Sequence, residues 1–159
     1  MKKLLVLVAL IAISAGAINA QKRAIGARLG YGEYFSYQHN MGEKNMLELE
    51  VGLPGIGHDG KWGLEVVGTY DWIFPISGWE EDGNWNWYAG VGAGAGLYGD
   101  YFFAGIAGRL GIEYNFDFPL NLSLDWRPIF GPRFGSGKIG FYDGGLYNGA
   151  IAWGIRYRF

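Results

Sequence analysis

The chain has 159 residues, which is enough for one domain with its own core and too few for two domains of usual size. It contains no cysteine, which excludes disulfide bonds and a lipid anchor on an N-terminal cysteine, and its formal net charge of −2 gives nothing that would attract nucleic acid. Its 29 glycines accompany 7 tryptophans, 11 tyrosines and 10 phenylalanines but only 5 prolines, a composition that favours strands and turns over disorder.

Residues 1–20 have the organisation of an export signal. Lys2 and Lys3 precede an apolar run that starts at Leu4, and small residues gather before Ala20. A membrane-anchoring helix is the alternative, but the run is short and ends in small and polar residues. We therefore predict a signal peptide over 1–20 and a mature domain over 21–159. Cleavage would remove Lys2 and Lys3 and change the formal net charge from −2 to −4.

After residue 20, apolar residues recur with a period of two rather than with a helical period. The alternation predicts eight strands, at 23–30, 33–40, 45–53, 62–76, 85–98, 101–116, 120–130 and 146–159. Residues typical of turns separate them, and the glycine-rich stretch 131–145 is predicted to be a long loop. The turn at 30–33 decides the number of predicted strands. Without it, the first two segments would merge, and a further strand would have to come from 131–146 to keep the number even.

Each predicted strand has an apolar face and a polar or small face, because side chains alternate between the two faces of a strand. Val67 and Ile73 are apolar exceptions on the polar face. The charged residues of the polar faces are Arg28, Glu48, Glu50, Glu65, Asp71, Arg109, Glu113, Asp125, Arg127, Arg156 and Arg158.

Every cation in this set is arginine, whereas Lys44, Lys61 and Lys138 fall in predicted turns. Arginine is preferred in enclosed ion pairs because its planar guanidinium can bond a carboxylate at two points. The polar faces are therefore predicted to point into a closed barrel as a charge network in the lumen. The apolar faces are then predicted to meet lipid.

Aromatic residues give a second argument for a barrel in a membrane. If both chain ends lie on one side, the outward-facing aromatics nearest that side form one ring that is drawn from four strands. Its members are Trp72, Phe74, Trp85, Trp87, Tyr114, Phe116, Tyr157 and Phe159. Trp62, Phe102, Trp126, Phe130 and Tyr147 fall near the opposite rim. Aromatic girdles that bound an aliphatic band are typical of barrels at membrane interfaces.

With these features the sequence resembles the small eight-stranded outer-membrane β-barrel proteins of Gram-negative bacteria, the OmpA/OmpX-like class. The resemblance covers the mature chain and rests on the export signal, the eight alternating segments, the arginine and carboxylate interior and the final Tyr157-Arg158-Phe159. It implies an all-β fold, a closed antiparallel eight-stranded up-and-down transmembrane barrel in the outer membrane. It also implies that the assembly machinery recognises the terminal strand through Tyr157 and Phe159.

An eight-stranded barrel is just wide enough for side chains to fill its interior, so a general diffusion pore is not expected. The sequence predicts a non-enzymatic role in envelope structure or in surface interaction through the outer loops. The expected surroundings are outer-membrane lipid and lipopolysaccharide, the expected state is a monomer, and the surface ligand is not specified. No cofactor, metal site or nucleic-acid partner is expected.

Three alternatives remain open at this point. The first is a narrow channel, and the second is a soluble periplasmic lipocalin-like binder. The third is a lipid acyl hydrolase or transferase in which His58, Asp59 and Ser136 would meet in the outer loops, with His39 as the other histidine.

Two glycine-containing motifs and one acidic run have structural explanations. Residues 94–99, GAGLYG, fit a dinucleotide-binding pattern, but no helix is predicted to follow them. Their glycines are instead predicted to make room for large side chains in the lumen. GSGK at 135–138 is predicted to be a mobile loop rather than a phosphate-binding loop, and the acidic run 80–82 is predicted to be a solvated turn on the periplasmic side.

Overall fold

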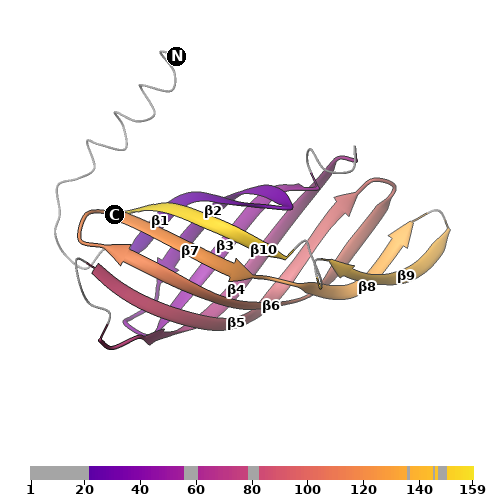
Figure 1. The fold of residues 1–159 in the computed structure, drawn as a ribbon. Coiled ribbons are helices and arrows are strands. Elements are labelled where there is room, and N and C mark those ends of the chain that lie inside the picture. Colours follow the sequence, from indigo (N-terminus) through magenta and orange to yellow (C-terminus); the bar gives the residue numbers. More distant parts are fainter. Residues whose placement is uncertain (1–21, 56–60, 79–82, 136, 145, 147–149) are drawn as a thin grey trace, which may run out of the picture.

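The computed structural model describes residues 22–55, 61–78, 83–135, 137–144, 146 and 150–159 (Figure 1). In these residues the chain forms ten β-strands, which are β1 (Arg23–Gly30), β2 (Gly32–Asn40), β3 (Asn45–Pro54), β4 (Gly63–Pro75), β5 (Gly83–Tyr98), β6 (Tyr101–Phe116), β7 (Leu120–Trp126), β8 (Ile129–Gly135), β9 (Lys138–Gly144) and β10 (Ile151–Arg158). Among the described residues there is no helix long and apolar enough to cross a membrane, a finding that does not bear on crossing by strands.

Eight of the strands form a closed antiparallel barrel. Each of β1 to β5 pairs with the strand that follows it in the chain. β6 then pairs with β7, β7 pairs with β10, and β10 pairs with β1. The closing seam between β1 and β10 extends to the last residue, because the backbone N–H of Phe159 donates to the carbonyl of Arg23 over 2.8 Å. The predicted closed eight-stranded barrel is therefore confirmed.

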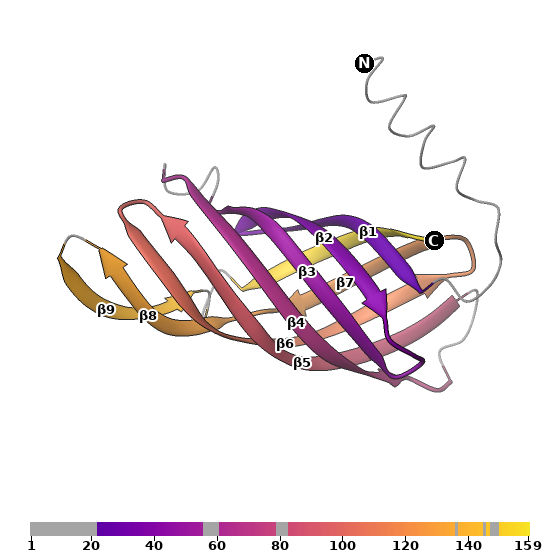
Figure 2. The ribbon, with the colours of Figure 1, turned by 180° about the vertical axis from the view of Figure 1, so that it is seen from behind.

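The predicted turn at 30–33 is also formed. β1 and β2 pair in antiparallel register from Arg23 opposite His39 to Leu29 opposite Glu33. The strand ends therefore meet closely around Tyr31. This turn is at the end of the barrel away from the C-terminus, together with the β5–β6 turn (Figures 1 and 2). We call this end the hairpin end and the other the terminal end.

The predicted loop at 131–145 is wrong, because β8 and β9 form a hairpin there. β8 continues the line of β7 along β6 without a change of register: Trp126 lies opposite Leu110, and Ile129 lies opposite Ala107, three residues further along both strands. Pro128 interrupts the line because proline has no backbone N–H, although its carbonyl still accepts from the N–H of Gly108 over 3.0 Å.

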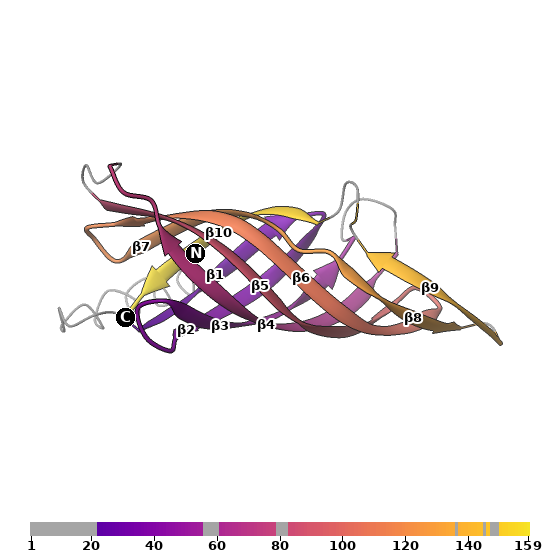
Figure 3. The same ribbon diagram turned by 90° about the horizontal axis from the view of Figure 1, so that it is seen from below.

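The β8–β9 hairpin projects from the hairpin end of the barrel (Figures 1 and 3). β9 pairs with β8, and β10 pairs with β7. Gly144 of β9 lies opposite Ile129, and Ile151 of β10 lies opposite Trp126. Gly144 and Ile151 are seven positions apart, whereas their partners are three positions apart. These four additional residues explain why β9 and β10 are separate strands.

The two faces of the barrel wall differ in the way that the alternation predicts. In β3 every outward residue from Leu47 to Leu53 is aliphatic and exposed, whereas Glu48 and Glu50 are buried inside. The apolar exceptions Val67 and Ile73 are also buried inside.

Val67 belongs to an apolar cluster with Phe103, Ala107 and Ile129, whereas Ile73 packs with Met46 and Tyr88. The two inward apolar residues that broke the sequence pattern thus belong to two separate apolar clusters inside the barrel.

Inward-facing glycines make room for large side chains, as predicted for GAGLYG. A Cβ atom on Gly96 would lie 2.9 Å from the ring of Phe103, and one on Gly94 would lie 2.8 Å from Ile129. On β6, a Cβ on Gly111 would lie 2.5 Å from the ring of Tyr88. These glycines are therefore part of the packing of the barrel interior.

Candidate functional site

The middle of the barrel is filled by a charge network that we call the lumen plug. Its members are all buried and come from six strands and the segment that joins β7 to β8; they are Arg28, Glu48, Glu50, Glu65, Asp71, Arg109, Asp125, Arg127 and Arg156. Each was expected at an inward position because it has the parity of the polar face of its strand.

Arg109 of β6 is at the centre of the plug. Its guanidinium forms ion pairs with Glu48, with Asp71 at 3.3 Å and with Asp125 at 2.9 Å. The guanidinium carbon also lies 4.8 Å from the ring centroid of Tyr88. One arginine thus joins carboxylates from β3, β4 and β7 across the lumen.

Arg156 of β10 connects the same centre to the closing strands. It donates to Glu48 over 2.6 Å and to the hydroxyls of Ser36 and Ser123, each over 2.7 Å. Gln38 also donates to Glu48 over 2.9 Å. Because Arg156 reaches partners on β2, β3 and β7, these contacts form only when the barrel is closed.

A second group of ion pairs lies nearer the hairpin end. Arg28 donates to Asp125 over 2.8 Å, and Arg127 donates to Glu65 over 3.0 Å. Arg127 Nε also lies 3.0 Å from Glu50, close enough for an ion pair although the angle does not make a hydrogen bond. Both guanidinium groups lie over the ring of Tyr34. The distance from the guanidinium carbon to the ring centroid is 5.8 Å for Arg28 and 5.0 Å for Arg127.

The two remaining predicted members of the charge network lie nearer the terminal end. Glu113 is buried and accepts hydrogen bonds from the side-chain amides of Asn86, Asn115 and Asn121, over 2.9 to 3.0 Å. Arg158 is only partly buried, and it donates to the backbone carbonyls of Phe116 and Phe118 rather than to a described carboxylate. The plug therefore contains five carboxylates and four arginines, which is as close to balance as the six acids and five arginines on the predicted polar faces.

Neutral polar side chains complete the plug, and they were not singled out as site residues. Ser36, Gln38, Thr69 and Ser123 are buried and have the same parity as their charged neighbours, so the alternation could have identified them. Tyr88 is harder to predict because it is an aromatic residue between Asn86 and Gly90 on the polar and glycine-rich inner face of β5. It is fully buried and donates to Asp125 over 3.1 Å.

The predicted aromatic girdle lies on the outside of the barrel, at the terminal end. Its members contact one another across strands: Phe74 stacks on Trp87 with 4.2 Å between ring centroids, and Trp85 lies 4.8 Å from Tyr114. Trp72 and Phe159 are exposed, whereas Phe116 and Tyr157 are partly buried.

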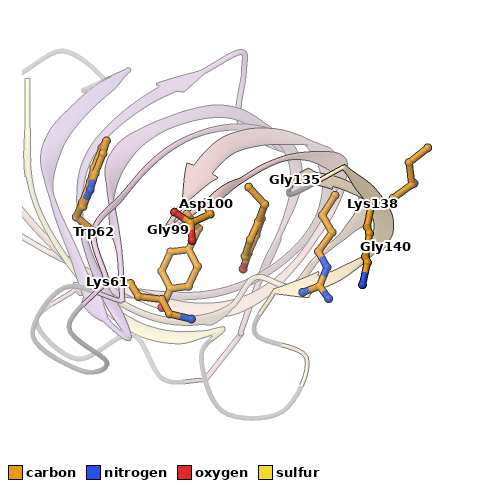
Figure 4. A pocket seen from close by; sticks show the side chains of 11 residues that line it. Lys61, Trp62, Gly99, Asp100, Gly135, Lys138 and Gly140 are labelled. Atoms are coloured by element: carbon orange, nitrogen blue, oxygen red, sulfur yellow. The ribbon is translucent and has the colours of Figure 1, made fainter.

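A hollow lies at each end of the described part of the barrel. The hairpin-end cavity has a volume of about 620 Å³, and its wall includes Lys61, Asp100, Arg133 and Lys138 (Figure 4). The terminal-end cavity has a volume of about 600 Å³, and its wall includes four asparagines together with Glu43, Glu113 and Arg158. The central plug residues Arg109 and Arg156 line neither hollow.

The residues of the open enzymatic alternative are only partly described. His58, Asp59 and Ser136 lie outside the described residues, as do the acidic run 80–82 and the segment 1–20. His39 is described at the end of β2, where its Nδ1 atom lies 3.3 Å from the hydroxyl of Tyr37. Among the described residues, no group of three or more histidine or carboxylate side chains is arranged to hold a metal ion.

Comparison with known proteins assigns no family to this chain. A scan against protein-family models, a search of curated proteins and a search of solved structures each gave no match to this chain. The protein is therefore defined by its structure as a closed antiparallel eight-stranded β-barrel with a charged, side-chain-filled interior.

Proposed function

We propose that this chain is an integral outer-membrane β-barrel with a non-enzymatic role in envelope structure or surface interaction. The observation that carries the proposal is the reversal of polarity across the barrel wall. Arg109 and Glu48 are almost fully buried, whereas the outward-facing Leu49 and Ile155 are 46% and 48% exposed. A water-soluble barrel would solvate its charges and cover a continuous aliphatic band, because exposed apolar patches of this extent promote association.

Backbone hydrogen bonding and strand length both support insertion of the barrel into a lipid bilayer. In a bilayer every backbone N–H and C=O must be paired within the protein, and ring closure meets that requirement without leaving a strand edge in the wall. A strand needs about 9 to 11 residues to cross the hydrocarbon region. β3 has 10 residues and β4 has 13, so both are long enough.

The aromatic girdle supports an orientation relative to the membrane surface. The stacked pair Phe74 and Trp87 and the neighbouring Trp85 and Tyr114 lie at the terminal end, outside the barrel. Aromatic rings prefer the headgroup region because it accommodates both their apolar faces and their polar atoms. In this proposal the terminal end faces the periplasm, and the hairpin end faces the cell exterior.

The lumen plug supports a role other than general diffusion. A continuous water path would have to separate Arg109 and Arg156 from carboxylates that they contact at hydrogen-bond distance. Breaking such enclosed pairs leaves uncompensated buried charges and is strongly unfavourable. We therefore assign the function to the surfaces of the barrel, with the hairpin end as the part available to partners outside the cell.

Fractionation combined with gel mobility tests the proposal. The protein should remain with outer membranes after osmotic shock and carbonate washing, and detergent should extract it. Without boiling it should then run on SDS gels as a compact, protease-resistant band that shifts on heating. Release of the protein by osmotic shock, without any heat-dependent shift, would overturn the membrane assignment and favour a soluble binding protein.

A further inference from the structure

The hairpin-end cavity is an inward-facing hollow that the lumen plug does not fill. Arg133 of β8 has the same parity as buried Ile129, and Lys138 of β9 has the same parity as Tyr142, which stacks on buried Phe103. Both cations therefore project from the inner face of the hairpin. Figure 4 shows Lys61 and Trp62 on one side of this hollow and Lys138 on the other, with Asp100 between them. Its volume of about 620 Å³ is within the range of small-molecule sites.

The charge of this cavity is opposite in sign to that of the whole chain. Among the described residues of its wall, Lys61, Arg133 and Lys138 are cations and Asp100 is the single carboxylate. Within the described part of the chain, neither Arg133 nor Lys138 forms an ion pair with a carboxylate. The excess positive charge would attract and hold a ligand that carries negative charge.

The guanidinium of Arg133 is held in place before any ligand arrives. It lies over the ring of Tyr101, with 5.4 Å from the guanidinium carbon to the ring centroid. Across the hairpin, a Cβ atom on Gly140 would lie only 2.7 Å from Arg133 Nε, so glycine leaves the space that the side chain occupies. An arginine fixed between a ring and a strand loses less conformational freedom when it binds a phosphate or a carboxylate.

Aromatic rings form the inner surface of the cavity and separate it from the plug. Tyr98 and Tyr101 line it, with 5.8 Å between ring centroids. Beneath them Tyr142 stacks on Phe103 at 3.9 Å and lies 6.2 Å from Tyr101. Burial raises the pKa of the Tyr142 hydroxyl above its ordinary value, so this ring stays neutral. The surface thus consists of tyrosine rings and hydroxyls, with Lys61 over the ring of Tyr98 and Arg133 over the ring of Tyr101.

We propose that the hairpin-end cavity binds an anionic saccharide, meaning a sugar that carries a phosphate or a carboxylate. Arg133 and Lys138 would bind the anionic group, and Tyr98 and Tyr101 would pack on the sugar ring and hydrogen-bond its hydroxyls. The proposal rests on the surface-interaction role proposed above and gives it a ligand class. A glycolipid headgroup and a free polysaccharide share this chemistry.

Calorimetric titration of the purified full barrel in neutral detergent tests the site. The probes are digalacturonate and glucose 6-phosphate, with cellobiose as a neutral disaccharide, glucose as the sugar without its phosphate, and inorganic phosphate as the bare anion. We expect heats of binding from the two acidic sugars and none from the neutral ones. Binding should weaken as salt rises, because the attraction is electrostatic. Equal binding of cellobiose and digalacturonate, or binding of inorganic phosphate alone, would overturn the proposal.

Matched variants locate the binding in the cavity. Arg133→Gln and Lys138→Gln should each weaken binding of the acidic sugar by about tenfold, the effect expected from losing one charge-assisted contact. Lys44→Gln removes the same charge from the turn before β3 at the opposite end and should leave binding unchanged. If Arg133→Gln and Lys138→Gln keep the heat-dependent gel shift and bind like the unchanged protein, the site is wrong.

The source of the ligand follows from two further titrations. Lipopolysaccharide is compared with the lipid-free, phosphorylated polysaccharide released from it. Binding of both supports the proposal with a free saccharide as ligand, and binding of lipopolysaccharide alone supports it with a glycolipid headgroup. Failure of every acidic probe on a barrel that shows the gel shift and stays with the membrane overturns the site only. Loss of the gel shift and of membrane association in the unchanged protein overturns the proposed function itself.

Discussion

The lumen plug and the hairpin-end cavity use the same kinds of side chain in opposite ways. In the plug, Arg109 and Arg156 are surrounded by carboxylates and hydroxyls within one barrel cross-section. In the cavity, Arg133 and Lys138 lie on an open inner face without a described carboxylate partner. Buried charge that is paired within the protein stabilises one closed arrangement, whereas exposed positive charge in excess is available to a ligand.

The largest difference between the two regions is expected when an arginine is removed from each of them. Arg109→Met leaves Glu48, Asp71 and Asp125 without their shared partner inside the barrel. We expect the free energy of unfolding to fall by about 3 to 5 kcal/mol, because the remaining charges stay buried. Urea unfolding of the refolded barrel in detergent micelles, followed by the gel shift, measures the change.

Arg133→Met is the matched control for that experiment. It makes the same substitution where no buried carboxylate depends on the arginine, so the unfolding midpoint should stay close to that of the unchanged protein. Equal losses from both substitutions would mean that the hairpin-end cavity is as much a part of the folded core as the plug.

A charge placed on the outer face of the barrel wall tests whether that face lies in lipid. Leu49 faces outward near the middle of β3, opposite Gly68. Leu49→Arg should lower the free energy of unfolding in lipid vesicles by about 2 to 4 kcal/mol, the cost of arginine near the bilayer midplane. Met41→Arg, in the exposed turn between β2 and β3, is the control and should have almost no effect. A neutral result for Leu49→Arg would contradict the membrane assignment.

Glycine substitutions test how closely the plug is packed. A Cβ atom on Gly111 would lie 2.5 Å from Tyr88 and 2.8 Å from Asp125, whereas one on Gly68 meets no atom closer than 4.0 Å. Gly111→Ala should therefore reduce stability by about 1 to 3 kcal/mol through overpacking, and Gly68→Ala should not. The difference between their urea midpoints measures the effect, and equal midpoints would show that the lumen can relax around an added methyl group.

The smallest expected effect concerns the position of Arg133. In Gly140→Ala the added methyl group would displace the guanidinium from its place over Tyr101 without removing its charge. The free energy of unfolding should change by less than about 0.5 kcal/mol, because Arg133 is exposed and its displacement leaves the barrel interior unchanged. Affinity for digalacturonate should fall by a few-fold in the titration described above. Unchanged affinity would mean that charge alone, without the fixed orientation, determines binding.

Much of the barrel wall could be predicted from alternation because a strand has only two faces. The parity of Glu48 and Glu50 against Leu47 and Leu49 was enough to place the first pair inside and the second outside. The β8–β9 hairpin was missed because the many glycines of 131–145, together with Pro132, weaken the strand signal. Its alternation of Lys138, Gly140 and Tyr142 with apolar residues was nevertheless present, and it would have identified the inner face of the hairpin.

The sequence by itself determined the all-β fold class, the inward and outward faces of the strands, and the presence of arginines and carboxylates on one side of the wall. These properties are local, because they depend only on the alternation within each strand. The tertiary structure decided which charges meet: Arg156 reaches Ser36 and Glu48 only after β10 has paired with β1. It also decided that Arg158 lies apart from the plug and that Arg133 and Lys138 share a cavity. Those arrangements follow from barrel closure and from strand register, which bring together residues that are far apart in the chain.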